Sequence, residues 1–327
     1  MVPRHPEVAR LAVAALLAIA SMWAGAQAPY PTRAVRIIVP YAPGALTDVL
    51  ARTIGQRLSV AMGQPFVVEN RPGAGTLTGA EVVARSAPDG YTLLMATSTT
   101  LGISPALYAT SPIDPLKDFA PVSQVGTVNF FLIANPSFPA RNVKEMIETL
   151  RRSPGKYNYA SVGSGSPHHL FMEILKHEYD LDVQHVAYKG TPAALADLIA
   201  GRIDFMFADA TVAVPNIVAG KVVALGTSAA KPTALMKNVP PIAATVSDFD
   251  WQAWQGIVAP AGTPQDIVER LWRELRTIED SPQFRDDLVK FGMEPLPSRT
   301  PAEFAAAVAS ELPRWATIVK TSGARVD

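Results

Sequence analysis

The chain of 327 residues contains no cysteine, which excludes disulfide bonds, thiolate metal sites and a lipid-anchored cysteine. It also lacks an excess of either charge, because 29 Lys and Arg balance 29 Asp and Glu. Without a basic excess, nucleic acid is not an expected partner. Its N-terminal apolar run, residues 11–20, is shorter than the roughly 20 residues that a membrane span needs. The apolar fraction of 48% indicates a globular chain, long enough for about two domains.

The first 26 residues show the three parts of a secretory signal peptide. Arg4 and Arg10 supply the positive start, residues 11–20 the apolar segment, and residues 24–26 the small side chains before a cleavage site. We therefore expect residues 1–26 to be removed, so that the mature protein begins at Gln27 in the periplasm. An uncleaved membrane anchor is the alternative.

Two series of alternating strands and helices follow, a pattern typical of parallel βαβ units. The first series has strands at residues 35–39, 66–69 and 91–96 and helices at 48–61 and 78–86. The second has strands at 129–134, 158–160, 183–187, 203–207 and 222–225, with helices at 143–152, 168–178, 193–200 and 213–219. Later helices at 264–279, 282–291 and 301–322 add no third sheet, so we expect them to fold back onto the first of two α/β lobes.

Three loops lead from the end of a strand into the N-terminus of a helix. They are residues 40–48, 161–167 and 188–192. In the last two, Ser166 and Thr191 are suited to cap a helix, and each is followed by a proline at the first helical position. A helix N-terminus attracts anions, and ligands of α/β sheets bind at the carboxyl ends of the strands. The pattern predicts an anion site between the lobes; the alternative is that the caps only start helices.

No catalytic or metal-binding constellation stands out. His169 and Glu173 share a helix face, but no third metal ligand is evident. Ser164 is not set in a Gly-x-Ser-x-Gly motif. Trp251 and Trp254 are interpreted as core anchors rather than ligand-stacking residues. We expect no enzyme activity, metal or cofactor, with a periplasmic hydrolase as the less favoured alternative.

Ordered motifs extend over nearly the whole chain after residue 30. They are Tyr30-Pro31, the Pro-Gly loop ending at Thr47-Asp48, residues 68–75 (VENRPGAG), 88–93 (PDGYTL), 163–170 (GSGSPHHL), 188–190 (YKG), 197–204 (DLIAGRID) and 259–264 (APAGTP). In this order they resemble the Bug-type solute-binding receptors of tripartite tricarboxylate transporters. Any one motif alone is weak, whereas the ordered set is specific.

The resemblance implies a type II periplasmic-binding-protein fold, in which two α/β lobes are joined by two crossover strands. It places the crossings near Gly126 and Gly226, so that residues 27–125 and 226–327 form lobe 1 and residues 126–225 form lobe 2. It further implies a small organic carboxylate as ligand, inner-membrane transporter subunits as partners, and a monomer. A ligand sensor for a signalling partner on the same fold is an alternative.

The family grips the ligand's carboxylate with loops of both lobes, and ordered water assists. Carried over by position, this implicates the following residues as ligand-binding: Tyr41, Gly44, Ala45, Thr47, Asp48, Ser98 and Thr99 from lobe 1, and Ser161, Gly165, Ser166, His168 and Asp209 from lobe 2.

Two positions depart from the family pattern. Ala45 stands where the family commonly has the second glycine of a Gly-Gly pair, and a methyl group there disfavours a positive φ. Thr76 stands where glycine is also common. Either change alters the surroundings of the ligand, so the resemblance does not identify the acid that binds.

Overall fold

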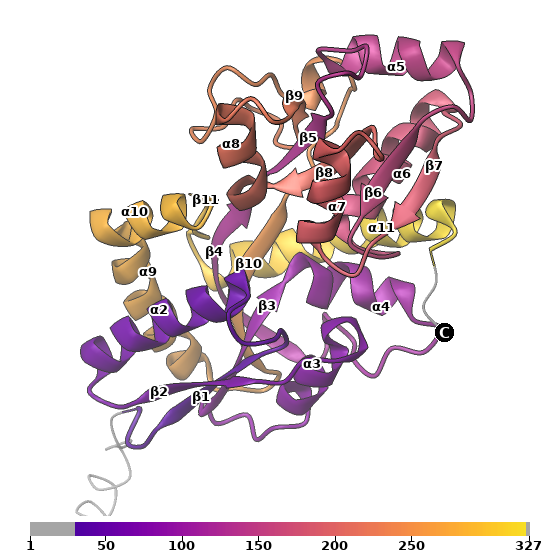
Figure 1. Ribbon diagram of the computed structural model, residues 1–327. Helices are drawn as coiled ribbons and strands as arrows, with labels where there is room; N and C mark the ends of the chain where they lie inside the picture. The colour runs from indigo at the N-terminus through magenta and orange to yellow at the C-terminus, as the bar shows by residue number, and fades with distance from the viewer. Residues whose placement is uncertain (1–29, 325–327) are drawn as a thin grey trace, which may run out of the picture.

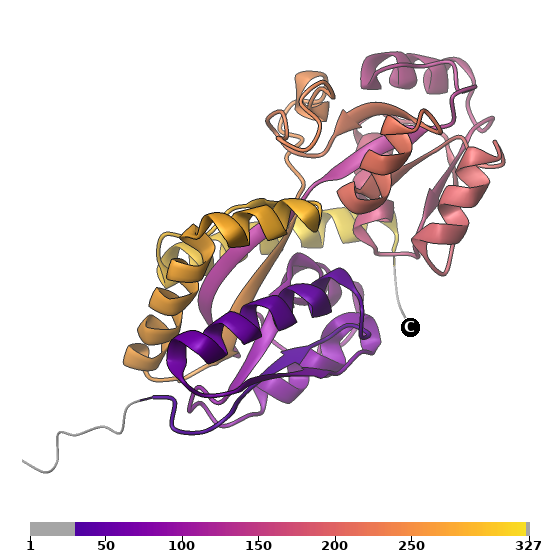
Figure 2. The same cartoon turned by 60° about the vertical axis from the view of Figure 1, so that its left-hand side comes forward.

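The computed structural model describes residues 30–324, which fold into two α/β lobes (Figure 1). The expected signal peptide, residues 1–26, lies outside the described residues. Figure 2 separates the lobes, with the first at the lower left and the second at the upper right. The two lobes and their two connections fit the type II periplasmic-binding-protein fold that the resemblance implies.

The first lobe is built on one six-stranded sheet. Its strands are β1 (Val35–Val39), β2 (Phe66–Asn70), β3 (Thr92–Thr97), β4 (Phe119–Val128), β10 (Ala253–Pro260) and β11 (Met293–Pro295). They lie in the order β11-β4-β10-β3-β1-β2. β1 runs parallel to β2 and β3, whereas β10 runs antiparallel to β3 and β4. Its helices are α2 (Leu46–Met62), α3 (Leu77–Ala84), α4 (Ser104–Leu107), α9 (Gln265–Asp280), α10 (Pro282–Lys290) and α11 (Pro301–Ser322).

The second lobe has a five-stranded sheet. Its strands are β5 (Phe130–Ala134), β6 (Asn158–Ser161), β7 (Gln184–Ala187), β8 (Phe205–Asp209) and β9 (Val223–Thr227), in the order β7-β6-β8-β5-β9. β6 runs parallel to β7 and β8, and β5 runs antiparallel to β8 and β9. Its helices are α5 (Val143–Arg152), α6 (Pro167–Tyr179), α7 (Thr191–Ile199) and α8 (Ala210–Val218).

The chain passes between the lobes a few residues later than the resemblance implied at the first crossing, and well after Gly226 at the second. Gly126 lies inside β4, and only Asn129 separates β4 from β5 in the other sheet. Gly226 lies inside β9, and the chain returns to the first sheet only at Ala253. Both glycines serve close packing instead: an added Cβ would lie 2.7 Å from the carbonyl oxygen of Glu294 at Gly126, and 2.8 Å from a side-chain carbon of Ile242 at Gly226.

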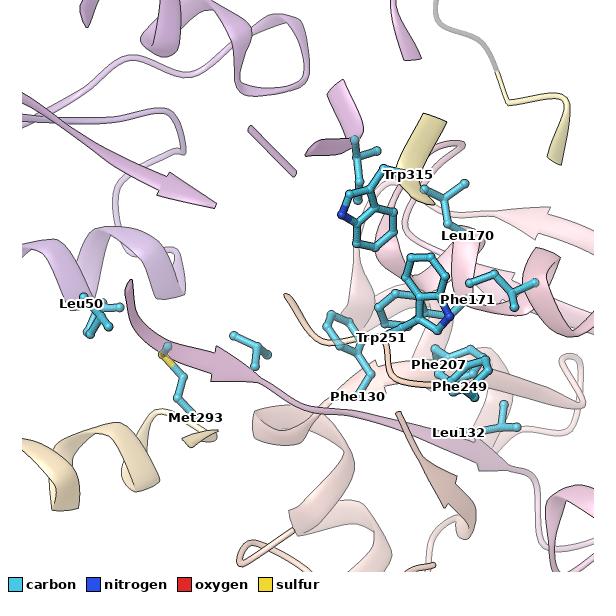
Figure 3. Close-up of a cluster of buried hydrophobic side chains, with 14 of the residues drawn as sticks. Leu50, Phe130, Leu132, Leu170, Phe171, Phe207, Phe249, Trp251, Met293 and Trp315 are labelled. Carbon is cyan, nitrogen blue, oxygen red and sulfur yellow. The ribbon is translucent and has the colours of Figure 1, made fainter. Parts of the chain in front are cut away.

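The returning segment, residues 228–252, packs against the second lobe. Its Phe249 stacks on Phe207 of β8, with ring centroids 6.3 Å apart. Trp251 follows, and its ring lies 4.8 Å from that of Trp315 on α11. Figure 3 shows these rings together with Phe171 of α6, which stacks on Trp315 at 6.3 Å. Helix α11 therefore contributes to the core of both lobes, and Trp251 is a core anchor as expected.

Candidate functional site

A cleft of about 680 Å³ lies between the lobes. Eight of the twelve expected ligand-binding residues line it. They are Tyr41, Ala45, Thr47 and Thr99 from the first lobe and Gly165, Ser166, His168 and Asp209 from the second. The cleft thus brings together the loops that follow β1, β3, β6 and β8, at the carboxyl ends of these strands.

The other four expected residues do not line the cleft: Gly44, Asp48, Ser98 and Ser161. Ser98 is fully buried. Ser161 is also buried, and its hydroxyl lies 2.7 Å from Nε2 of His185 and accepts a hydrogen bond from the Gly163 amide at 3.1 Å. Ser161 therefore helps to hold its own loop in place rather than facing the cleft.

Asp48 anchors the first loop. The residue is 3% exposed. Its carboxylate accepts hydrogen bonds from the Gly44 amide at 2.9 Å, Nδ2 of Asn70 at 2.8 Å and Nε of Arg52 at 3.0 Å. Burial would raise the pKa of Asp48, but these hydrogen bonds outweigh it and hold the pKa below its ordinary value. The aspartate is therefore an ionised brace for the loop.

Because Asp48 holds this loop in place, the start of α2 lies beside the cleft. Leu46 and Thr47 line the cleft and occupy the first turn, whose amides an α-helix leaves unpaired. Gly44 takes φ 82°, whereas Ala45 has φ −67° and ψ 157°. The concern that a methyl group at Ala45 opposes a positive φ is therefore wrong, because the positive φ falls on Gly44.

The second-lobe loop is bonded within itself. Ser166 caps α6, as expected, by accepting from the His169 amide at 3.3 Å, and donates its hydroxyl to the Gly163 carbonyl at 2.7 Å. The Gly165 amide donates to Nδ1 of His169 at 3.2 Å. At the third junction the cap is Gly190, and Thr191 is already helical, so Thr191 lines the cleft from the first turn of α7.

His168 presents an unpaired imidazole to the cleft. It is 8% exposed, and neither ring nitrogen has a hydrogen-bond partner among the described residues. Its ring meets Phe130 edge-on, with centroids 5.0 Å apart. Burial lowers the pKa of His168 to about 4, against the opposing charge of Asp209. The neutral ring therefore offers one donor and one acceptor at neutral pH.

Asp209 is the one formally charged side chain among the cleft-lining residues that the structure describes. It caps α8, where its Oδ1 accepts from the amides of Thr211 at 3.1 Å and Val212 at 3.3 Å. No lysine or arginine of residues 30–324 lines the cleft. An anion bound there is therefore met by helix N-termini and neutral donors rather than by a counter-cation.

Several residues that line the cleft were not predicted from the sequence. Gln255 on β10 has a buried Oε1 without a partner in the described part of the chain, and Thr76 has a buried unpaired Oγ1. Trp254 is buried as expected but also lines the cleft, while its Nε1 donates to Glu311 at 2.7 Å. The departure from the family pattern at Thr76 was a sequence signal that could have placed this residue in the cleft. No such signal marked the residues of β10.

The hydrolase alternative needs a base hydrogen-bonded to a nucleophile such as Ser164. Ser164 and His168 both line the cleft, but no nucleophile–base hydrogen bond joins them, since both His168 nitrogens are unpaired among the described residues. Within residues 30–324 no group of three or more His, Cys, Asp or Glu side chains is placed to hold a metal ion. In the same range no helix is long and apolar enough to cross a membrane.

Comparison with known proteins agrees with this geometry. The chain is 36% identical over 298 residues to a UPF0065 protein of Bordetella pertussis, covering 88% of each chain. It is 31% identical over 319 residues to Protein BugT of the same species, covering 95% of this chain and 98% of BugT.

Two solved structures are similar over their whole length. Rpa4515 of R. palustris with adipate has a TM-score of 0.78 at 32% identity and matches 91% of this chain and 100% of that one. MatC of Rhodopseudomonas palustris with bound malate has a TM-score of 0.73 at 32% identity and matches 89% and 100%. Residues 50–324 match the family model described as tripartite tricarboxylate transporter family receptor, and the chain belongs to this family of receptors.

Proposed function

We propose that the protein captures a small organic carboxylate in the interlobe cleft and presents it to the inner-membrane subunits of a tripartite transporter. The observation that carries the proposal is the cleft itself, in which helix N-termini and unpaired buried polar atoms from both lobes meet without a metal site or catalytic pair among the described residues. Adipate and malate in the two similar structures support a carboxylate as ligand.

The dipoles of the helices supply the attraction. Leu46 and Thr47 begin α2 in the first lobe, and His168 and Thr191 lie in the first turns of α6 and α7 in the second. Each helix N-terminus carries roughly half a positive charge and unpaired amides. A carboxylate that bonds to both lobes favours the closed arrangement, because only closure completes its set of donors.

The test is calorimetric titration of the purified protein with adipate, malate and a panel of other organic acids. We expect at least one acid to bind with a stoichiometry of one and to be recovered chemically unchanged. An acid at 100 times its Kd stabilises the protein by about 2.7 kcal/mol, which a thermal-shift screen detects. Conversion of the acid, or no binding by any acid, contradicts the proposal.

The periplasm is the compartment that the proposed function requires. We propose that residues 1–26 act as a signal peptide and that the monomeric mature chain begins at Gln27. Mass spectrometry of the periplasmic protein should find Gln27 at the N-terminus, and light scattering should give the mass of one chain. A full-length chain retained in the membrane contradicts the export.

A further inference from the structure

Thr76 holds a backbone conformation that suits glycine. Its φ is 85° and its ψ −10°, in the left-handed region. A β-branched residue rarely adopts this conformation, which glycine takes without penalty. Ala74 and Gly75 before it also have positive φ values, of 44° and 57°. The chain therefore keeps a threonine here at a cost in stability.

Neighbouring groups fix this turn. The Thr76 amide donates to the Gly73 carbonyl at 2.9 Å, and the hydroxyl of Ser104 donates to the Gly75 carbonyl at 2.5 Å. Tyr108 covers Gly75 so closely that an added Cβ there would lie 3.1 Å from its ring. The position of the Thr76 side chain is thus determined by the first lobe before any ligand arrives.

The hydroxyl of Thr76 serves no structural purpose that the described residues show. Thr76 precedes α3 in the cap position, yet its side chain makes no capping hydrogen bond. The residue is 6% exposed, lines the cleft, and has a buried Oγ1 without a partner among residues 30–324. Backbone strain and an unpaired buried hydroxyl on one side chain are both costs, and such costs gather where a ligand binds.

The chemistry of the other unpaired atoms restricts the class of ligand that the cleft can bind. Oε1 of Gln255 is a hydrogen-bond acceptor, buried and without a donor within the described chain. An ionised carboxylate contains acceptors only, so it leaves this oxygen unpaired. A ligand hydroxyl or amino group supplies the missing hydrogen. The hydroxyl of Thr76 and the neutral ring of His168 can each donate to such a ligand or accept from it.

We propose that Thr76 determines specificity, by selecting with Gln255 an acid that carries a hydrogen-bond-donating substituent over the corresponding unsubstituted acid. The inference rests on the proposed carboxylate-binding function of the same cleft. The carboxylate lies at the helix N-termini, and the hydroxyl or amino substituent bonds to the uncharged polar atoms.

The test titrates the wild-type protein with matched acids: succinate, malate and aspartate; propionate, lactate and alanine; benzoate, 4-hydroxybenzoate and 4-aminobenzoate. Within the series that binds, we expect a hydroxyl or amino member to bind roughly tenfold or more tightly than the unsubstituted acid. The hydroxyl and amino members show which substituent the cleft takes. Thr76→Ser should keep this preference, whereas Thr76→Val, which keeps the branched shape, should lose it.

Thr76→Gly is the most informative variant, because its stability should rise while its preference for the substituted acid should be lost. Removing the strain should raise Tm by about 2–4 °C, while the preference for the substituted acid is lost. Ala74→Gly is the matched control. It also relieves a positive φ but lies outside the cleft lining, so it should raise Tm and leave the preference intact.

The outcomes separate the inference from the proposed function. If the wild-type protein binds an unsubstituted acid as tightly as its hydroxyl and amino counterparts, or if Thr76→Val and Thr76→Gly keep the wild-type preference, the inference is overturned and the carboxylate receptor stands. If the wild-type protein binds no acid, either in these series or in the wider panel, the proposed function is overturned, and the inference with it.

Discussion

His168 combines burial with a position on the cleft wall, and this gives the protein a sensitivity to acid. Its pKa is lowered to about 4 by burial, from an ordinary value of 6.5. Between these pH values the unfolded chain binds a proton that the native chain does not. The free energy of unfolding therefore falls as the pH falls from 6.5 towards 4. His169 contributes in the same direction, because burial and His185 lower its pKa to about 4 as well.

His168→Leu should remove one part of this dependence. We expect the wild-type protein to lose stability between pH 7 and pH 4.5, with about 2–3 kcal/mol of the loss attributable to His168. The variant should lose correspondingly less, while remaining at least as stable at pH 7, because leucine fills a similar volume without an unpaired polar atom. Urea unfolding at both pH values measures the difference. Parallel losses in the two proteins would contradict the assignment.

Asp48 was expected as a ligand-binding residue, and its contacts show that it holds the loop before α2 in place. Its bond to the Gly44 amide fixes the loop that leads to Leu46 and Thr47. Asp48→Asn should lower the free energy of unfolding by about 1–3 kcal/mol at pH 7, because charged hydrogen bonds are lost. The affinity for the acid should fall as well, since the loop amides are held less firmly.

A matched control separates these effects. Asp287 pairs with Arg57 at 2.6 Å, away from the cleft lining, and its pKa is also lowered, chiefly by the hydrogen bond from Arg57. Asp287→Asn should therefore reduce stability and leave affinity unchanged. Both carboxylates stabilise the protein above pH 4, and this contribution is lost as the pH falls through their lowered pKa values. Unchanged affinity in Asp48→Asn would limit Asp48 to a structural role.

At the scale of elements, most helices and strands followed from the sequence, but β4, β10 and β11 of the first sheet did not. Residues 143–152 and 301–322 are helices with the expected bounds, because their apolar spacing and caps are local signals. β4 and β10 escaped prediction, since their polar residues interrupt the apolar pattern. The partners of this strand are distant in sequence: the Ser123 hydroxyl of β4 donates to Glu279, and the backbone N–H of Gln124 donates to the Ser298 hydroxyl. No local pattern contains such a pairing.

The same limit applies to the site. Strand-to-helix loops were predictable as cleft walls, because the carboxyl ends of parallel strands meet at one edge. Gln255 and Trp254 entered the cleft only because β10 returns from a distant part of the chain to pair with β3 and β4. Phe130 entered it as the first residue of β5, directly after the crossing.

Substitution of Gly126 tests whether this glycine near the first crossing acts as a hinge or allows close packing. An alanine there would bring its Cβ to 2.7 Å from the carbonyl oxygen of Glu294, a backbone atom that β11 pairing holds in place. Gly126→Ala should therefore cost about 1–3 kcal/mol of stability. Gly226→Ala meets the movable side chain of Ile242 first and should cost less. Denaturant unfolding compares them, and a Gly126→Ala variant of native stability would argue that this part of β4 yields.

At the scale of the whole molecule, the lobes touch on two sides of the cleft. Leu107 of the first lobe lies against Gly165 of the second, where an added Cβ would come within 2.4 Å of a leucine methyl group. Gly292 of the first lobe lies against Thr211 at the start of α8, and an added Cβ would lie 2.8 Å from its Cγ2. Closeness of the lobes thus depends on the absence of a side chain at both glycines.

Gly292→Ala tests whether this closeness matters for capture. Gly292 does not line the cleft itself, although Thr211, which the added methyl group would meet, does. The methyl group should hold the lobes slightly apart and lower the fraction of molecules that close. Apparent affinity falls in proportion to that fraction, so a tenfold smaller closed fraction weakens Kd tenfold. We expect a clear rise in Kd by calorimetry, and a larger radius of gyration by X-ray scattering with ligand present.

Gly323→Ala is the control for backbone strain. If this variant keeps its affinity, strain alone does not explain a rise in Kd of Gly292→Ala. Gly292 and Gly323 have nearly equal φ values, 68° and 66°, but an added Cβ at Gly323 meets nothing within 4 Å. Backbone strain should therefore cost both alanine variants a similar amount of stability, about 1–2 kcal/mol, to which the contact with Thr211 adds in Gly292→Ala. Only Gly292→Ala should weaken binding, because only there does the new methyl group press on the other lobe. Equal affinities in the two variants would mean that the contact between Gly292 and Thr211 is incidental to ligand capture.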